Sequence, residues 1–397
     1  MTDLTRLDLV VNVRFPGDRA HGIQVAAMAE ALADTGLNVD VVVPRRFPYR
    51  ATDPWDHYGV RRTFGVHRIA NIDTIDMVPA HAQRVPFLVQ SVTFGLRALA
   101  RVAVERDAGV LVRDHYTTEI LVGGLRGSDR DRLAAEVHNL PQDPGRRKRL
   151  MTVLRKLRAV ITISDGLKDE LVGEGLEPDN VLVARDGVHL HRYAGQPEAS
   201  VARQHIGVNV ERPTVVYAGQ LYEWKGVDTL IAAFEHLPDA QLVVVGGDRE
   251  NLPRIEAAVQ RHAPGRVVLT GQVNPMTVPF YLAAADVIAL PNSAKEEISR
   301  RFTSPLKMFE AMASERALVA SDIPSLREVL VHEQNALLAA PDDPAALAEA
   351  LRRALDDGEL RDRLATRARE DVEAFDWRER GRNVAHFLRD RLILDAR

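Results

Sequence analysis

The sequence predicts an α/β protein built from two doubly wound, Rossmann-like domains that face each other across a cleft. Three observations support this prediction. Short β-branched runs alternate with longer amphipathic stretches, which is typical of a mostly parallel sheet with helices on both faces. The alternation pauses at about 181–195 and then starts again, so the pattern occurs twice. A chain of 397 residues is also long enough for two domains.

The first alternating segment begins with the near-continuous apolar run 7–13, as expected of a strand that is buried on both faces. The stretch 22–35 follows with apolar residues at helical spacing, and the run 39–43 predicts a second strand that stops at Pro44. Helices are predicted between the strands that come next. We expect those strands at 66–72, 110–112, 133–137 and 159–163.

The second segment restarts at 214–218 with the apolar run TVVYA. Further strands are predicted at 242–245, 267–269, 287–290, 318–320 and 336–339, again alternating with helices. The last part of the chain is helical in pattern, up to a final segment from about 377. We therefore expect a first domain at 1–190, a second domain at 191–376, and a C-terminal helix at 377–397 that packs back on the first domain.

Composition excludes several classes of protein. A net charge of −4 argues against a nucleic-acid-binding protein or another general polyanion binder. The absence of cysteine excludes disulfides, zinc fingers, iron–sulfur clusters and cysteine nucleophiles, and it fits a reducing cytoplasm. The N-terminus does not have the pattern of a signal peptide. The most apolar stretch, 85–104, is interrupted by Arg97 and Arg101 and indicates a helix of a soluble protein, so we expect a cytoplasmic location.

Ligands of open parallel sheets bind beyond the carboxyl ends of the strands, so the residues that follow the strands are the candidates for function. Only 6 of the 52 basic residues are lysine, and two of these fall in the candidate site of the second domain. One is Lys225, in a loop that contains Gly219 and ends close to the start of a helix. A lysine there adds a point charge to the helix dipole, which suits a diphosphate. The alternative is a lysine in a solvated turn.

The other lysine is Lys307, in the segment 300–313. Ser304 is predicted to be a helix N-cap and Pro305 the first helical residue. The free N–H groups of Leu306 and Lys307, with the Lys307 side chain, then form a second anion pocket. Glu310 lies one helical turn further, where its carboxylate can accept hydrogen bonds from two ribose hydroxyls. The alternative is an ion pair between Lys307 and Glu310 within the helix.

The first domain offers two candidates. Gly22 comes at a predicted helix start after a long loop, where exposed N–H groups can approach an anion, although no G-x-G-x-x-G pattern is present. His138 directly follows the strand 133–137 and is placed to donate to a substrate hydroxyl or to act as a general acid or base. A structural role is the alternative for both. Two pairs are discounted as metal sites: Asp129/Asp131 lies in a polar stretch between elements, and His189/His191 lies in the interdomain connection with no third ligand nearby.

Several motifs in this order resemble one known family. They are Ala218-Gly219…Trp224-Lys225-Gly226, Gly271-Gln272-Val273, and Ser304-Pro305-Leu306-Lys307…Glu310-Ala311-Met312-Ala313. With them, nearly the whole chain resembles the retaining glycosyltransferases of the GT-B fold, in particular glycosyltransferase family 4. The resemblance implies that Lys225 holds a donor diphosphate and Glu310 the nucleotide ribose. It further implies that Gly271 and Val273 border the base, that His138 faces the transferred sugar, and that the Gly22 loop completes the phosphate and acceptor side.

Two positions depart from the usual pattern of that family. Gln220 stands where the family often has an arginine, and Phe302 stands where the first glutamate of the usual pair is expected. The chain instead resembles a subgroup built around Ser-Pro-Leu-Lys, in which Lys307 and Arg301 supply the lost positive charge. The missing glutamate is a sugar contact in the family pattern, so the identity of the sugar stays open.

The resemblance implies a hexosyltransferase-type enzyme that moves a sugar from a nucleoside-diphosphate sugar to an acceptor with retention of configuration, in glycan, glycolipid or glycoside biosynthesis. Neither a metal nor another cofactor is expected, because helix N-termini and the side chains of Lys225 and Lys307 neutralise the leaving diphosphate. Two alternatives stay open. One is a sugar-nucleotide epimerase of similar fold, and the other is a catalytically inactive sugar-nucleotide-binding protein.

The stretch 145–160 contains seven basic residues and no acidic residue. Arg146, Arg147, Lys148 and Arg149 cluster at its start, and apolar residues follow. This pattern is typical of a basic amphipathic helix that docks on anionic lipid, so we expect peripheral contact with the inner face of the membrane. The alternative is a solvated helix face whose arginines pair with acids elsewhere in the chain.

Overall fold

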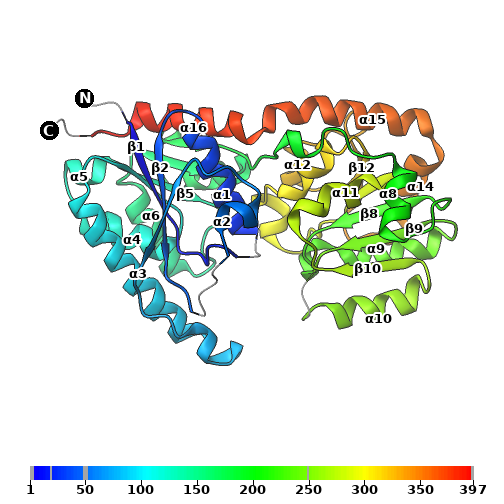
Figure 1. Ribbon diagram of the computed structural model, residues 1–397, viewed down its shortest axis with the longest axis horizontal. Helices are drawn as coiled ribbons and strands as arrows, with labels where there is room; N and C mark the ends of the chain where they lie inside the picture. Colours follow the sequence, from blue (N-terminus) through cyan, green and yellow to red (C-terminus); the bar gives the residue numbers. More distant parts are fainter. Residues whose placement is uncertain (1–3, 18–19, 48–51, 248–249, 395–397) are drawn as a thin grey trace. The chain divides into compact units, whose positions relative to one another are not determined.

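The computed structural model describes residues 4–17, 20–47, 52–247 and 250–394. Its contacts divide the chain into a first unit, Met1–Arg185 with Trp377–Arg397, and a second unit, Asp186–Asp376. The division between Arg185 and Asp186 lies five residues before the boundary predicted at 190. Each unit is a parallel sheet covered by helices, which confirms the predicted α/β architecture (Figure 1).

The first unit contains a seven-stranded parallel sheet in the order β3-β2-β1-β4-β5-β6-β7. The predicted strand 66–72 ends early, at Ile69, because its neighbour ends at Pro44 and leaves no partner beyond that pair. The edge strand β7 was not predicted, since three residues are too few to show a period. The strands are β1 (Arg6–Val10), β2 (Asn38–Pro44), β3 (Gly65–Ile69), β4 (Gly109–Val112), β5 (Leu133–Val137), β6 (Ala159–Thr162) and β7 (Val181–Val183).

Several helices of the first unit begin where a side chain accepts a hydrogen bond from one of the first free N–H groups. Asp114, Asp143 and Ser164 are such N-caps, for α4, α6 and α7 respectively. The helices are α1 (Ala20–Ala33), α2 (Pro54–Tyr58), α3 (Arg84–Val104), α4 (His115–Gly124), α5 (Ser128–Asp131), α6 (Pro144–Leu154), α7 (Asp165–Gly173) and α16 (Trp377–Arg391).

The C-terminal helix α16 packs along α1, although most of the chain separates them in sequence. The two helices approach closely at Gly381, where a Cβ atom would lie 2.5 Å from the carbonyl oxygen of Ala31. A glycine at this position therefore allows the contact.

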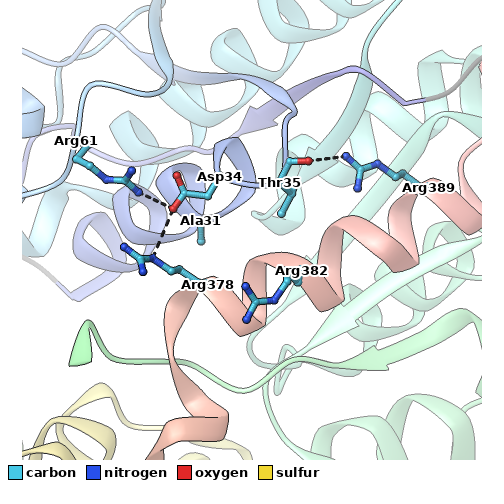
Figure 2. Close-up of a pocket in the computed structure, with 7 residues that line it drawn as sticks. All are labelled: Ala31, Asp34, Thr35, Arg61, Arg378, Arg382 and Arg389. Atoms are coloured by element: carbon cyan, nitrogen blue, oxygen red, sulfur yellow. Dashed lines mark hydrogen bonds and ion pairs between the residues drawn. The ribbon is translucent and has the colours of Figure 1, made fainter. Parts of the chain in front are cut away.

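An open pocket of about 550 Å³ lies beside this contact (Figure 2). Arg61 and Arg378 flank Asp34, and Arg389 donates to the carbonyl oxygen of Thr35 at 3.0 Å. These cations lie at the C-terminal end of α1, where they oppose the negative end of the helix dipole. The fourth arginine of the pocket, Arg382, pairs with Glu379 on its own helix. Arg378 and Arg389, which line the pocket, therefore help to hold α16 on α1.

The second unit contains a six-stranded parallel sheet in the order β10-β9-β8-β11-β12-β13. Neighbouring residues of one strand, such as Val215 and Val216, belong to two different apolar clusters, as alternation along a strand buried on both faces requires. The strands are β8 (Thr214–Ala218), β9 (Gln241–Val245), β10 (Val267–Gly271), β11 (Val287–Leu290), β12 (Ala317–Ser321) and β13 (Leu337–Ala339). The helices are α8 (Ala199–Ile206), α9 (Val227–Ala233), α10 (Leu252–His262), α11 (Val278–Ala283), α12 (Leu306–Ala313), α13 (Pro324–Arg327), α14 (Pro344–Asp356) and α15 (Gly358–Asp371).

Each sheet reverses its strand order beside its first strand, between β1 and β4 in the first unit and between β8 and β11 in the second. In open parallel sheets the carboxyl ends at such a reversal are where ligands bind. The residues that follow these strands are therefore the ones that position a candidate site.

Candidate functional site

The loop between β8 and α9 positions Lys225. The N–H of Gly219 donates to the carbonyl oxygen of Val245 at 2.8 Å, so it extends the sheet rather than facing a ligand. A 3-10 turn, Glu223–Lys225, then ends at Gly226, whose φ of +72° and whose Cβ position, 1.7 Å from the carbonyl oxygen of Pro291, both require glycine. The turn places the Lys225 ammonium 3.8 Å from the centre of the Trp224 ring.

The start of α12 differs from the prediction. Ser304 is not the N-cap and Pro305 is not helical: the helix begins at Leu306, and Pro305 is extended with ψ of 123°. The Ser304 hydroxyl instead accepts a hydrogen bond from the backbone N–H of Asp186 at 3.1 Å. Leu306 and Lys307 still occupy the first turn, whose N–H groups have no acceptor within the helix. The predicted anion-facing N–H groups are therefore present, although the cap is not.

Lys307 is buried, and its ammonium lies 4.7 Å from the centre of the Tyr217 ring. Its Nζ atom has no hydrogen-bond partner, and its aliphatic chain packs beside Gly219. Burial lowers the pKa of Lys225 to about 7. Burial, and then the charge of Lys225, lowers the pKa of Lys307 well below its usual value. Lys225 of the loop after β8 and Lys307 of α12 are thus close enough for the charge of one to act on the other, and no ion pair to either lysine is found among the described residues.

Glu310 does not pair with Lys307 in the structure. Its carboxylate accepts a hydrogen bond from the hydroxyl of Tyr193, a residue that the sequence did not single out. Burial raises the pKa of Glu310, while the nearby charge of Arg192 and the Tyr193 hydrogen bond act in the opposite direction. The ion pair that was weighed as the alternative to ribose binding is therefore not formed.

Asn292 is a second polar side chain that the sequence did not single out. Asn292 is the second residue after β11 and directly follows Pro291. Both its amide nitrogen and its amide oxygen are buried without a hydrogen-bond partner. The pairing of Ile288 with Val216 places this segment beside the turn after β8. An asparagine after a proline is an ordinary turn signal in sequence, so only its burial marks it.

The remaining predicted donor contacts lie around the same sheet. Gly271 ends β10 with φ of +65°, and the space that its Cβ would occupy is empty. Val273 is half-buried against one of the apolar clusters. Arg301 lies in a π-helical turn, Ile298–Phe302, with a guanidinium nitrogen 3.7 Å from the carboxylate of Glu297. The guanidinium of Arg301 therefore forms an ion pair with Glu297.

In the first unit, His138 is held by hydrogen bonds on both sides of its ring. Nε2 lies 2.7 Å from a carboxylate oxygen of Glu136, and a guanidinium nitrogen of Arg113 lies 3.2 Å from Nδ1. Burial, and then the charge of Arg113, lowers the pKa of His138 to about 4. The ring is therefore neutral at pH 7, with its proton on Nε2 facing the carboxylate. This arrangement disfavours the predicted role of His138 as an acid–base group.

Glu136 is the centre of this buried network. It also accepts a hydrogen bond from Arg380 of α16 at 2.8 Å. Burial alone would raise the pKa of Glu136, but the charge of Arg380 and the hydrogen bond from His138 outweigh it, so that pKa lies well below its usual value. His21 lies near the same charges, and its Nε2 is buried without a partner. The sequence signal for the network is a carboxylate inside an otherwise apolar strand, which demands a cation.

Gly22 is the third residue of α1 and so lies in its first turn, at the helix start as predicted. A Cβ there would come within 2.2 Å of the Tyr58 hydroxyl, which itself hydrogen-bonds both the N–H and the carbonyl oxygen of Gly17. A glycine is therefore required at position 22 because a larger side chain would collide with Tyr58. Residues 18 and 19 of the preceding loop lie outside the described residues.

Among the described residues, no group of three or more histidine, aspartate or glutamate side chains could hold a metal ion. Asp129 and Asp131 face arginines instead, at 3.5 Å from Arg106 and 3.4 Å from Arg158. The rings of His189 and His191 contact each other edge to face at 5.5 Å between centroids.

Comparison with known proteins now adds to this geometry. Residues 199–371, which carry β8, Lys225, Lys307 and Glu310, match the family described as glycosyl transferases group 1. These residues are therefore similar to that family. The resemblance drawn from the motifs is thereby confirmed, and the matched segment contains Lys225 and Lys307.

The relatives of the chain agree with the group 1 assignment. The chain is 32% identical over 215 residues to the D-inositol 3-phosphate glycosyltransferase of Xylanimonas cellulosilytica, which covers 52% of this chain and 50% of that protein. The chain spans about half the length of the curated relatives it matches.

Solved structures share the fold over almost the whole chain. The sucrose-phosphate synthase of Thermosynechococcus elongatus has a TM-score of 0.78 at 22% identity, covering 97% of this chain and 98% of that one. The Anabaena protein Alr3699/HepE, solved in complex with UDP, has a TM-score of 0.76 at 18% identity and covers 97% and 100%. These neighbours confirm the predicted GT-B-like fold class.

Proposed function

We propose that the protein is a retaining glycosyltransferase that moves a sugar from a nucleoside-diphosphate sugar to a hydroxyl acceptor, in glycan, glycolipid or glycoside biosynthesis. One observation carries the proposal: the Nζ atom of Lys307 is buried without a hydrogen-bond partner, and its side chain lies beside Gly219, in the loop that carries Lys225. A desolvated ammonium without a partner is unfavourable, and a dianionic diphosphate supplies the missing charge. The relative solved with UDP binds a ligand of this kind.

In this proposal the lysines act on the leaving group. Negative charge grows on the diphosphate as its bond to the sugar breaks, and Lys225, Lys307 and the first N–H groups of α12 stabilise it. The Glu310 carboxylate, oriented by Tyr193, accepts hydrogen bonds from the ribose. Gly271, with open space at its Cβ, and Val273 border the base. We assign the proton of the acceptor hydroxyl to the leaving phosphate, on the same face of the sugar.

The first unit offers a different kind of surface. Its buried charges are already paired around Glu136 and His138, so it suits an acceptor that reacts through a neutral hydroxyl. Within this proposal His138 is a positioning residue for that edge and does not transfer a proton. The reaction needs no metal, since the two lysines supply the positive charge that a metal would supply elsewhere. We place the enzyme in the cytoplasm, at the inner face of the membrane.

A thermal-shift screen against UDP, GDP, dTDP and their sugars tests the proposal. A ligand at about 100 times its dissociation constant adds roughly 2.7 kcal/mol, so a matching donor produces a clear shift. Slow release of nucleoside diphosphate without acceptor distinguishes a transferase from an inactive binder, and full activity in excess chelator is expected. No shift with any nucleotide, or activity that requires added metal, contradicts the proposal.

A further inference from the structure

The outer face of α3 carries an uncovered row of large apolar side chains. Val85 is 67% exposed, Leu88 43% and Leu96 54%, with Val89 beside them. Positions three, four and seven or eight apart share one face of a helix, so these four form a continuous row, the α3 stripe. The opposite face of α3 is covered: Phe94, Ala98 and Val102 are buried in the first unit. Only one of the two apolar faces of this helix is thus covered by the fold.

Other exposed apolar side chains gather near the α3 stripe. Of the fifteen large apolar residues exposed in the described parts of the chain, nine lie between 47 and 104. Ile72 and Met77 belong to the connection from β3 to α3, and Phe87 contacts the ring of Tyr116 on α4. Scattered apolar residues are normal on a protein surface, whereas a gathering of this kind marks an interaction site.

The charged residues of α3 itself all have one sign, whereas the neighbouring helix α4 carries Glu119, which lies 3.8 Å from Arg149 of α6. The helix contains Arg84, Arg97 and Arg101 and no acidic residue. Arg84 and Arg97 are exposed, whereas Arg101 is directed at Glu105 and Asp8. Helix α4 packs on α3, and α6 packs on α4, so the three form one layer. In that layer α6 exposes Arg146, Lys148 and Arg149.

The structure also changes the membrane contact expected from the sequence. Of the apolar residues expected to enter the lipid, Met151, Leu154 and Leu157 are buried in the unit and Val153 is half-buried. Arg147 pairs with Glu170 and Glu174. A lipid-facing apolar surface on α6 is therefore wrong. The helix can supply charge to a docking surface, but the apolar contact has to come from a neighbouring element.

We propose that the first unit docks on an anionic membrane surface through the α3 stripe, with Arg84, Arg97 and the exposed basic residues of α6 contacting the lipid headgroups. An apolar row bordered by cations is the chemistry of a helix that lies in the membrane interface. A second copy of the chain fits less well. Two α3 stripes packed together would bring arginines of both copies close, and the helix has no acidic residue to pair with them.

The docked helix lies on the membrane and does not cross it. By length and composition alone, α3 is the one helix in the described residues that could span a bilayer. Its inner face, however, packs in the core of the first unit through Phe94, Ala98 and Val102. Only the α3 stripe is then available to enter the interfacial region of the lipid. Docking of this kind does not depend on the proposed transferase activity.

Co-sedimentation with vesicles tests the docking surface. We expect the wild-type protein to bind vesicles of phosphatidylcholine mixed with phosphatidylglycerol, not vesicles of phosphatidylcholine alone, and to bind less as salt is raised. The double variant Leu88→Glu/Leu96→Glu should lose this binding. Val331→Glu, at a 44% exposed position of the second unit, is the matched control and should keep it.

A charge variant and an oligomer measurement complete the test. Arg84→Gln/Arg97→Gln should weaken binding about 30-fold, since each basic residue near an anionic surface contributes about 1 kcal/mol. Melting curves verify that the exposed substitutions leave the fold intact. Unchanged binding of Leu88→Glu/Leu96→Glu, or equal binding to neutral vesicles, overturns the proposal. So does a wild-type dimer in analytical ultracentrifugation that the same double variant abolishes, because the stripe would then bind a second copy.

Discussion

The buried charged groups at the carboxyl edges of the two sheets differ in whether they have partners. At the edge of the first unit, Glu136 lies between Arg380 and His138, and every charge has a partner of opposite sign or a hydrogen bond. At the edge of the second unit, the charge of Lys225 acts on Lys307, whose buried Nζ atom has no hydrogen-bond partner. The first arrangement is complete without a ligand. The second becomes favourable only when an anion arrives, which is why we place the donor diphosphate there.

The difference also predicts how each edge responds to substitution. Removing one member of a paired, buried network leaves its partner uncompensated and destabilises the fold. Removing a buried ammonium that has no partner removes its desolvation cost and leaves the fold intact. Such a substitution therefore changes only ligand binding. The four predictions below use this contrast, from the largest expected effect to the smallest.

Glu136→Gln should destabilise the protein by about 3–5 kcal/mol, because Arg380 is left buried without a counter-charge. The pKa of Glu136 lies well below its usual value, so its contribution is fully present above about pH 4.5 and is lost as the pH falls through the folded-state pKa. Denaturant unfolding at pH 7 and at lower pH measures both effects. The exposed Glu349→Gln is the control, and equal stability of the two variants would contradict the role of the network.

Lys307→Met should lower kcat/KM for the donor by about 10- to 100-fold, since a hydrogen bond to a charged group contributes roughly 1.5–3 kcal/mol. Its melting temperature should stay the same or rise, because the ammonium it removes has no partner. Steady-state kinetics and thermal unfolding measure the two. Lys295, whose side chain is 81% exposed, supplies the control Lys295→Met. A variant that is destabilised but fully active would assign Lys307 a structural role.

The affinity for the nucleoside diphosphate should fall as the pH rises above about 7, by up to tenfold per pH unit, because the ligand binds the charged form of Lys225. Stability without ligand should change in the opposite direction. The folded-state pKa is below the unfolded one, so the unfolded chain binds more protons and stability rises between about pH 7 and pH 10.

Isothermal titration over this pH range, with the nucleotide that the thermal-shift screen selects, measures the affinity. Lys225→Met should weaken binding and flatten both pH profiles. An affinity that is independent of pH in the wild-type protein would show that the ligand does not engage this ammonium.

Tyr193→Phe should raise the KM for the donor about 2- to 10-fold with little change in kcat, because one neutral hydrogen bond of roughly 0.5–1.5 kcal/mol no longer orients Glu310. Glu310→Gln should produce a larger change of the same kind. Initial-rate kinetics at saturating acceptor separate the two constants. A lower melting temperature with an unchanged KM in both variants would make the Tyr193–Glu310 contact structural.

The sequence by itself determined the strand and helix alternation, the two sheets, and the placement of Lys225 and Lys307 after strands of the second one. Buried parallel strands are apolar on both faces and stop at turn residues, so the alternation can be followed along the chain. Ligand-facing residues come directly after strands, so their positions follow from the same pattern. These features depend only on near neighbours in the sequence.

The tertiary structure alone decided which groups meet. Tyr193 reaches Glu310, the Ser304 hydroxyl binds the backbone of Asp186 instead of capping α12, and Arg380 reaches Glu136 from the far end of the chain. Periodicity also marks α3 as apolar on two faces, but it cannot say which face the fold covers. The physical reason is common to all four cases: a pattern gives the direction of a side chain on its own element, whereas its partner depends on elements that are distant in sequence.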